Sequence, residues 1–285
     1  MSVRNRKKRN ILLLILCGML AAGMTGCAGK EETKSEGITQ KTAEADTQQA
    51  VDADTPSNEE EAETEAETEE VEETAAEQYV VVIDPGHQMY GNSEQEPVGP
   101  GAQETKNKVT GGASGCVSGL NEYELNLLIS LKLEEILKNR GYEVIMTRTE
   151  NDVDISNAQR AAIANEADAD AFIRVHANDI EDSSHSGAMT ICQTPDNPYN
   201  GELYEESRRL SDCVLTELVS ATGCREEYVW ETDSMSGINW CEVPVTMVEV
   251  GYMSNPEEDA RMTTDSYQEK IAEGIANGVE AFLAQ

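Results

Sequence analysis

The sequence predicts an α/β fold with a single central sheet flanked by helices. Two observations predict it, and both come from residues 79–285. Short runs rich in valine and isoleucine have the composition of buried strands. Between them lie longer segments in which apolar residues recur every three or four positions, as on one face of a helix. Strands that alternate with helices in this way are typical of a sheet between helical layers.

Charge divides the 285-residue chain into three regions. The formal net charge is −34, from 21 Lys+Arg and 55 Asp+Glu, which argues against a nucleic-acid-binding protein because such a protein needs a cationic surface. Residues 1–26 hold five basic residues and no acidic one. Residues 28–78 hold 18 acidic and three basic residues, and residues 79–285 hold 37 acidic and 13 basic residues. The last region alone has the apolar content and the length of a folded domain.

Residues 1–26 are predicted to be a signal peptide. A basic start is followed by a short apolar run, residues 11–22, and then by small residues, which is the order found in secretory signals. Met24-Thr25-Gly26-Cys27 resembles a bacterial lipobox, with methionine in place of the more usual leucine. The resemblance implies cleavage before Cys27 and lipidation of its thiol. The alternative is an uncleaved anchor with an incidental cysteine, and both place the rest of the chain outside the cell membrane.

Residues 27–78 are predicted to be an acidic, disordered linker that follows the lipid anchor. They contain almost no large apolar side chains, so they cannot bury enough surface to offset the entropy lost on ordering. A flexible coil of this length reaches on the order of 40 Å. We expect the linker to hold the domain of residues 79–285 away from the membrane.

The first elements of the domain follow from local signals. Residues 79–84 form a predicted buried strand that ends at Pro85-Gly86. Residues 91–119 are Gly-rich and polar, have neither helical nor strand period, and predict a long loop, which in a compact domain is usually functional or mobile. A helix is predicted from Asn121 to Gly141. Its apolar stripe consists of Leu125, Leu128, Ile129, Leu133, Ile136 and Leu137.

Strands and helices alternate through the rest of the domain. Ser156-x-x-Gln159 is a capping box that begins a short Ala-rich helix reaching about Ala167. Further strands are predicted at residues 142–147, 171–175, 187–193 and 245–250. Further helices are predicted near residues 202–221, 257–262 and 266–284.

Two of the three histidines stand where a predicted strand gives way to a loop. His87 ends the segment Asp84-Pro85-Gly86-His87, and His176 lies in Val175-His176-Ala177-Asn178. Ligands bind at the strand ends of an α/β sheet, so we expect both imidazoles at one edge of the sheet. The third histidine, His185, lies in a Ser-rich polar loop and is predicted to be a surface residue.

A carboxylate lies between these histidines in the sequence. With Asn121 as the N-cap of its helix, Glu124 falls at the third helical position and can return a hydrogen bond to the cap. Glu122 is not needed for helix capping, so its side chain can turn toward the sheet. Two imidazoles and one carboxylate are the protein ligand set of a catalytic zinc, with the fourth position left to water or substrate. The sequence therefore predicts a Zn²⁺ site formed by His87, Glu122 and His176 at the strand ends.

Glu249 lies inside an apolar strand, within Val245–Gly251. A carboxylate there is costly to bury unless it is paired, hydrogen-bonded or protonated. Burial would raise its pKa, which suits a general base and acid. The alternative is an edge-strand residue that faces water.

The candidate site residues lie in four separate sequence segments: Val82–His87, Glu122-x-x-x-Asn126, Arg174–Asn178 and Val248–Asn255. From about Val80 to its C-terminus, the chain resembles the zinc-dependent N-acetylmuramoyl-L-alanine amidases. These bacterial enzymes cleave the amide between the lactyl group of muramic acid and L-alanine of the peptidoglycan stem peptide. The resemblance implies His87, Glu122 and His176 as zinc ligands and Glu249 as the catalytic carboxylate. It also implies peptidoglycan as the substrate, and with the lipid anchor it places the domain outside the membrane, facing the cell wall.

Two departures from the family concern substrate binding. The family usually has a small residue where this chain has Arg174, and many members carry a Leu-Arg pair where this chain reads Asn239-Trp240-Cys241-Glu242. Arg174 and Asn178 are candidates to hold polar groups of the glycan or the peptide. No dedicated wall-binding repeat is visible, so we expect targeting to rest on the lipid anchor.

Five cysteines lie in the domain: Cys116, Cys192, Cys213, Cys224 and Cys241. An odd number allows at most two disulfides, no pairing can be deduced, and free buried thiols are equally consistent with the sequence. Two other functions stay open. One is a cysteine-dependent wall hydrolase using Cys241 or Cys116 with a histidine, which leaves Glu122 and Glu249 unexplained. The other is a catalytically inactive peptidoglycan-binding lipoprotein.

Overall fold

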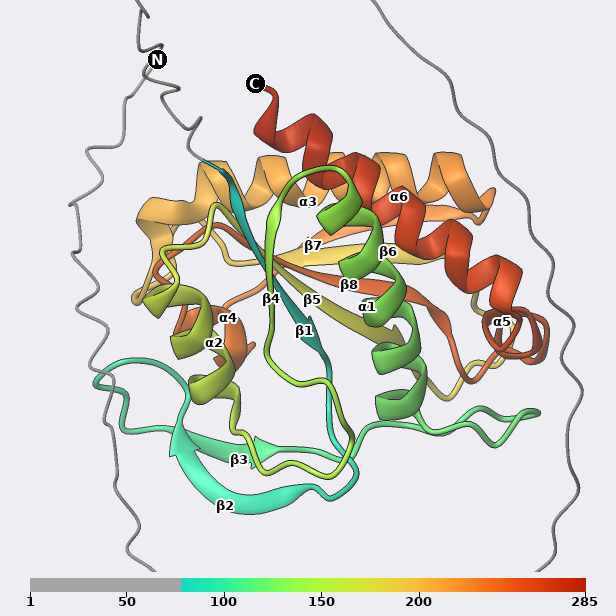
Figure 1. Cartoon of the computed structure of the whole chain (residues 1–285). Coiled ribbons are helices and arrows are strands. Elements are labelled where there is room, and N and C mark those ends of the chain that lie inside the picture. The colour runs from blue at the N-terminus through green and yellow to red at the C-terminus, as the bar shows by residue number, and fades with distance from the viewer. Residues whose placement is uncertain (1–77) are drawn as a thin grey trace, which may run out of the picture. The chain divides into compact units, whose positions relative to one another are not determined.

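The computed structural model describes residues 78–285. The predicted signal peptide, Cys27 and the linker up to residue 77 lie outside the described residues. A six-stranded sheet forms the centre of the domain (Figure 1). Its strands, in spatial order, are β4 (Glu143–Met146), β1 (Val80–Pro85), β5 (Ala171–Asn178), β8 (Val245–Tyr252), β6 (Ala188–Cys192) and β7 (Glu226–Glu231). The first four strands run parallel, and β6 and β7 run the opposite way.

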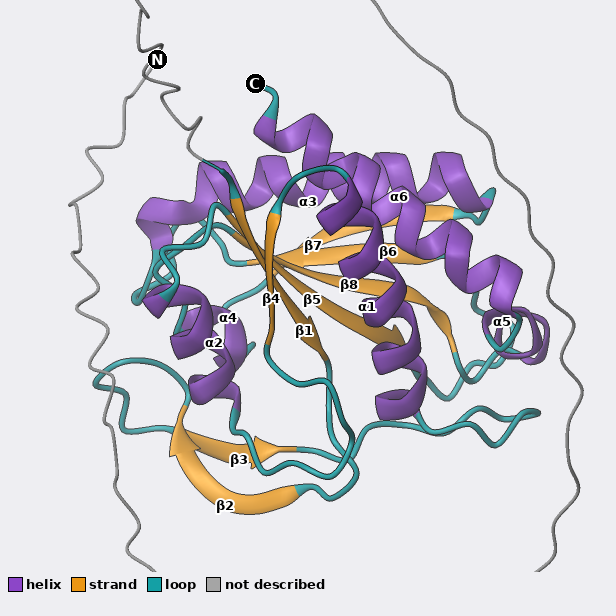
Figure 2. Ribbon diagram, viewed as in Figure 1, coloured by secondary structure: helices purple, strands orange, loops and turns teal. Residues whose placement is uncertain are grey.

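Helices cover both faces of this sheet (Figure 2). One face is covered by α1 (Glu122–Asn139), α3 (Tyr204–Thr222) and α6 (Asp265–Leu283). The other is covered by α2 (Asn157–Glu166) and α4 (Ser236–Asn239). The turn η1 (Gly201–Leu203) precedes α3, and α5 (Pro256–Met262) follows β8. Among residues 78–285, no helix combines the length and apolar character needed to span a bilayer.

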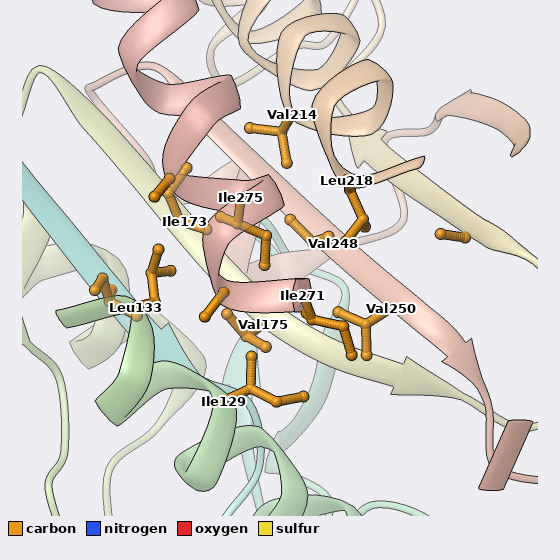
Figure 3. Close-up of a cluster of buried hydrophobic side chains, with 14 of the residues drawn as sticks. Ile129, Leu133, Ile173, Val175, Val214, Leu218, Val248, Val250, Ile271 and Ile275 are labelled. Atoms are coloured by element: carbon orange, nitrogen blue, oxygen red, sulfur yellow. The ribbon is translucent and has the colours of Figure 1, made fainter. Parts of the chain in front are cut away.

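Alternate residues of the central strands enter different cores. Ile173 and Val175 of β5 pack against α1 and α6 in the larger core, which Figure 3 shows with Ile129 and Ile271. Phe172 packs in the core under α2 and α4. Because side chains alternate along a strand, the polar residues of β5 at even positions share the face of Phe172. This face carries the candidate site.

The predicted α/β fold is confirmed, with a single sheet between helical layers. The prediction of a structureless loop over residues 91–119 is wrong in part. That segment contains an antiparallel hairpin of β2 (Asn92–Pro97) and β3 (Thr105–Val109), which forms a separate two-stranded sheet. Most of its residues are exposed, so no buried face imposes an alternating apolar pattern. The edge strand β7 and the single-turn helix α4 were not predicted.

Candidate metal and catalytic site

The structure brings the three predicted metal ligands together. One donor atom from each of His87, Glu122 and His176 lies within 4.8 Å of the others. His87 Nε2 lies 3.1 Å from Glu122 Oε1, and His176 Nδ1 lies 3.2 Å from the same oxygen. His87 follows β1, His176 belongs to the neighbouring strand β5, and Glu122 is the first residue of α1.

The ring of His87 is held in one orientation. Its Nδ1 lies 2.9 Å from the carbonyl oxygen of Thr110, just after β3. A carbonyl oxygen can only accept, so Nδ1 carries a proton and Nε2 is the nitrogen that faces Glu122. Metal-binding histidines typically donate their second nitrogen in this way, which fixes the tautomer. The backbone of His87 adopts a positive φ of 60° to place the ring.

His176 lies against a glycine that the sequence motif supplies. A side chain on Gly86 would collide with the imidazole ring, so the glycine before His87 makes room for the second ligand. Burial lowers the pKa of His176 to about 4, although the hydrogen bond that His176 donates to Glu122 opposes this shift. The imidazole is therefore neutral near pH 7, which is the form that binds metal ions.

Glu122 is ionised and fixed by backbone donors. The N–H of Ala113 donates to Oε2 at 3.0 Å, and the N–H of Ala177 donates to Oε1 at 3.3 Å. Burial alone would raise the pKa of Glu122, but hydrogen bonds with His176 and His87 outweigh it and hold the pKa well below its usual range. An anionic carboxylate between two imidazoles is a strong donor set for a divalent cation.

Glu124 has the separate role that its position in the helix predicted. The backbone N–H of Asn121 donates to Glu124 Oε2 at 3.1 Å, which closes the capping box at the start of α1. Asn121 Nδ2 also donates to this oxygen at 2.9 Å. Glu124 thus caps the start of α1, whereas Glu122 belongs to the candidate metal site.

The turn before α1 is fixed to a distant helix. Asp259 of α5 is 1% exposed. Its Oδ2 accepts hydrogen bonds from the backbone N–H groups of Val117 and Ser118, at 2.7 and 2.8 Å. Ser118 Oγ donates to Oδ1 at 2.6 Å. These bonds hold the segment that leads into Glu122.

Glu249 lies on the same face of the sheet, opposite His176 in the register of β8 and β5. Its strand is central, so the alternative of an edge residue facing water is excluded. Its Oε2 atom is buried without a hydrogen-bond partner. Burial, and secondly the charge of Glu122, raises the pKa of Glu249 to about 8. A carboxyl group with this pKa exchanges its proton readily near neutral pH.

Beneath the site lies a buried ion cluster centred on Asp84. Arg160 Nη1 lies 2.7 Å from Asp84 Oδ1, and Arg174 Nε lies 2.9 Å from Oδ2. Burial alone would raise the pKa of Asp84, but the two guanidinium groups hold it well below its usual range. Arg160 also donates to the carbonyl oxygens of Pro85 and His87. The cluster therefore fixes the chain that places His87.

Asp84→Asn is expected to lower the free energy of unfolding by about 3–5 kcal/mol, because it leaves two buried guanidinium groups without their anion. Urea denaturation at neutral pH measures the change. Glu134→Gln is the control, since Glu134 pairs with Lys138 on the surface and such pairs add little. Equal unfolding midpoints for the two variants would show that the buried cluster does not stabilise the fold.

Asn178 and His185 have different surroundings. Asn178 lines a hollow of about 320 Å³ with His176 and Glu249, so the structure places it beside the site. The prediction of His185 as a simple surface residue is incomplete. Its side chain is 35% exposed, and its Nε2 lies 2.6 Å from Oε1 of the buried Glu227.

The surroundings of Cys241 give no support to a thiol-based site at this residue. All five in the described part of the chain are free, so none of the possible disulfides is present there. Burial raises the pKa of Cys241 to about 12, and its Sγ donates to the carbonyl oxygen of Gly237. Cys241 is therefore a protonated thiol at neutral pH and a poor nucleophile.

Known proteins are similar to this chain in sequence and fold. Residues 81–281 match a family described as N-acetylmuramoyl-L-alanine amidase. The uncharacterized protein YqiI of Bacillus subtilis is 31% identical over 173 residues, which is 60% of this chain and 80% of YqiI. The N-acetylmuramoyl-L-alanine amidase LytC of the same bacterium is 27% identical over 202 residues, which is 71% of this chain and 35% of LytC.

Solved structures agree with the sequence comparison. The crystal structure of the N-acetylmuramyl-L-alanine amidase Ami1 from Mycobacterium smegmatis matches with a TM-score of 0.66 at 25% identity. The match covers 72% of this chain and 97% of the Ami1 chain. A family match over most of the chain, together with the common fold, gives one conclusion: the chain belongs to the N-acetylmuramoyl-L-alanine amidase family.

Proposed function

We propose that this protein is a zinc-dependent N-acetylmuramoyl-L-alanine amidase. It hydrolyses the amide between the lactyl group of muramic acid and L-alanine of the peptidoglycan stem peptide. The observation that carries the proposal is the convergence of His87, Glu122 and His176 beside Glu249 in a chain of this family. Family membership supports the reaction, and the chemistry of the donor set supports the metal.

The residues fit a zinc ion. Two neutral imidazoles and one carboxylate form a catalytic zinc set, in which a fourth position is left for water or substrate. The Nδ1–H of His87 donates to the Thr110 carbonyl, and its Nε2 faces Glu122. When bound, zinc supplies Lewis-acid polarisation of the amide carbonyl and lowers the pKa of a water molecule.

Glu249 carries the proton transfers. Its buried Oε2 has no hydrogen-bond partner, so this oxygen is free to take a proton from the attacking water. Once protonated, the same carboxyl group can donate that proton to the departing alanine nitrogen. Because β8 lies between β5 and β6, the carboxyl group is held on a rigid element of the sheet.

The test of the proposed reaction uses purified residues 78–285 and intact peptidoglycan. We expect new alanine amino termini to appear, to disappear after treatment with a chelator, and to return when zinc is added back. Termini that survive chelation would contradict zinc dependence. Bound zinc without new termini would favour the alternative of an inactive peptidoglycan-binding protein.

We further propose that the protein is exported and anchored through Cys27 to the outer face of the membrane, with residues 27–78 as its tether. The order of basic start, apolar run and cysteine supports this proposal. Cys27→Ala is expected to move the protein from the membrane fraction to the medium or the soluble fraction. An unchanged distribution on cell fractionation would contradict lipid anchoring at this residue.

A further inference from the structure

The cavity beside the metal site has a charge opposite to that of the domain. Residues 79–285 hold 37 acidic and 13 basic residues. The cavity, of about 610 Å³, contains His87, His176 and Glu249 in its wall. Among the described residues that line it, Glu249 is the only carboxylate, whereas Arg174 and Lys106 are both cationic. Two cations in a cavity of so acidic a domain indicate recognition of an anionic group.

Arg174 is rigidly placed for such a role. It precedes His176 by two residues on β5 and shares its face of the sheet, so their Cα atoms are about 6.6 Å apart. Its Nε donates to Asp84 Oδ2 at 2.9 Å, and its Nη2 donates to Asn157 Oδ1 at 2.8 Å. Gly237 provides room for its Nη1, because a side chain at that position would collide with this nitrogen.

The ion cluster leaves part of the positive charge of Arg174 unbalanced. Asp84 pairs with Arg160 as well as with Arg174, so one carboxylate faces two guanidinium groups. The cluster is buried, where electrostatic interactions are screened much less than on the surface. A net positive charge therefore remains in the wall of the cavity.

Lys106 supplies the second cation from the hairpin. Its Nζ donates to the carbonyl oxygen of Ser234 at 2.7 Å, which joins β3 to the segment before α4 across the cavity. An ammonium group has three donors, so hydrogen bonds remain for a ligand. Lys108, on the same strand, instead pairs with Glu94 and does not line the cavity.

We propose that Arg174 and Lys106 bind a carboxylate of the stem peptide, namely the free carboxyl group of the residue that follows L-alanine. This inference rests on the proposed amidase function and names its substrate preference. Two residues of extended peptide span about 7 Å, which matches the separation of His176 and Arg174 along β5. A neutral carboxamide at this position loses the charge-assisted hydrogen bonds, so stems with a free carboxylate are the preferred substrates.

The experiment compares two synthetic substrates with the zinc-loaded protein. They are N-acetylmuramoyl-L-alanyl-D-isoglutamate and its D-isoglutamine counterpart, each with its γ-carboxyl group blocked as the methylamide, so that they differ only in whether the α-carboxyl group is free or amidated. We expect kcat/KM to favour the free acid by at least about tenfold. Lys106→Gln and Arg174→Gln are expected to raise KM for the free acid. They should therefore lower the ratio of kcat/KM for the free acid to kcat/KM for the amide.

One control separates recognition by Lys106 from a general effect of losing a lysine on β3. Lys108→Gln changes a lysine on the same strand outside the cavity and should leave the ratio at its original value. Lys106 is exposed, so its variant tests the inference even if Arg174→Gln fails to fold.

The outcomes distinguish the inference from the proposed function. Equal kcat/KM for the two substrates, or a preference for the amide, overturns the inference and leaves the amidase function intact. A preference that persists at full size in Lys106→Gln and Arg174→Gln overturns the assignment to these residues. Hydrolysis of neither substrate by the zinc-loaded protein overturns the proposed function and this inference with it.

Discussion

Glu249→Gln is expected to lower the turnover number for peptidoglycan hydrolysis by roughly 10²–10⁴-fold, the usual contribution of a general acid–base group. Glutamine has nearly the same shape but cannot take a proton from water at Oε2 or return it to the leaving nitrogen. Glu249 is not among the three metal ligands, so the zinc content should stay unchanged. Kinetics of released amino termini and metal analysis of the purified variant give the two readouts.

Glu242→Gln is the matched control for this change, since Glu242 is an exposed glutamate shortly before β8. It should keep the activity of the unmodified protein. Turnover retained in Glu249→Gln would assign the proton transfers to another group. Loss of zinc from the same variant would show that Glu249 acts through the metal instead.

Glu122→Gln is expected to weaken zinc binding by more than about 100-fold, which is the upper end for loss of a group that only supports a ligand. The substitution removes the anionic member of the site and leaves His87 and His176 facing a neutral amide. Competition with a chelator of known affinity measures the zinc dissociation constant. Activity should fall in parallel at limiting zinc.

Glu124→Gln provides an unusually close comparison, two residues away in the same helical turn. Glutamine also completes a capping box, so zinc affinity should be unchanged and the helix should remain capped at Asn121. A similar loss of zinc affinity in both variants would contradict the division of roles between the two glutamates.

Local signals in the sequence were enough to predict the centre of the site. His87 and His176 both follow apolar runs, and parallel neighbouring strands bring their ends to one edge. The choice of Glu122 over Glu124 followed from helix capping, which depends only on residues close in sequence. The strands of the central sheet other than β7, and the long helices, were likewise visible from their apolar runs and periods.

Contacts between distant residues were not predictable in this way. Asp84 pairs with Arg160 and Arg174, which are 76 and 90 residues away, and nothing local to either arginine indicates its partner. Arg174 was expected to hold substrate, and the structure shows that its guanidinium is also part of the buried cluster. The hairpin of β2 and β3 was not predicted, because its strands are polar and mostly exposed and therefore show no alternating apolar pattern.

The hydrogen bonds between Asp259 and the turn at Val117 and Ser118 couple the stability of α5 to the integrity of the metal site. Hydrogen exchange in proteins proceeds through cooperative openings of contiguous structural units. If the seven-residue helix α5 unravels, the turn loses its three bonds to Asp259. Ala113 precedes that turn and holds Glu122 through its N–H, so the same opening loosens the carboxylate. The slowest-exchanging amides of the turn should therefore report the lifetime of the assembled site, although α5 contributes no residue to it.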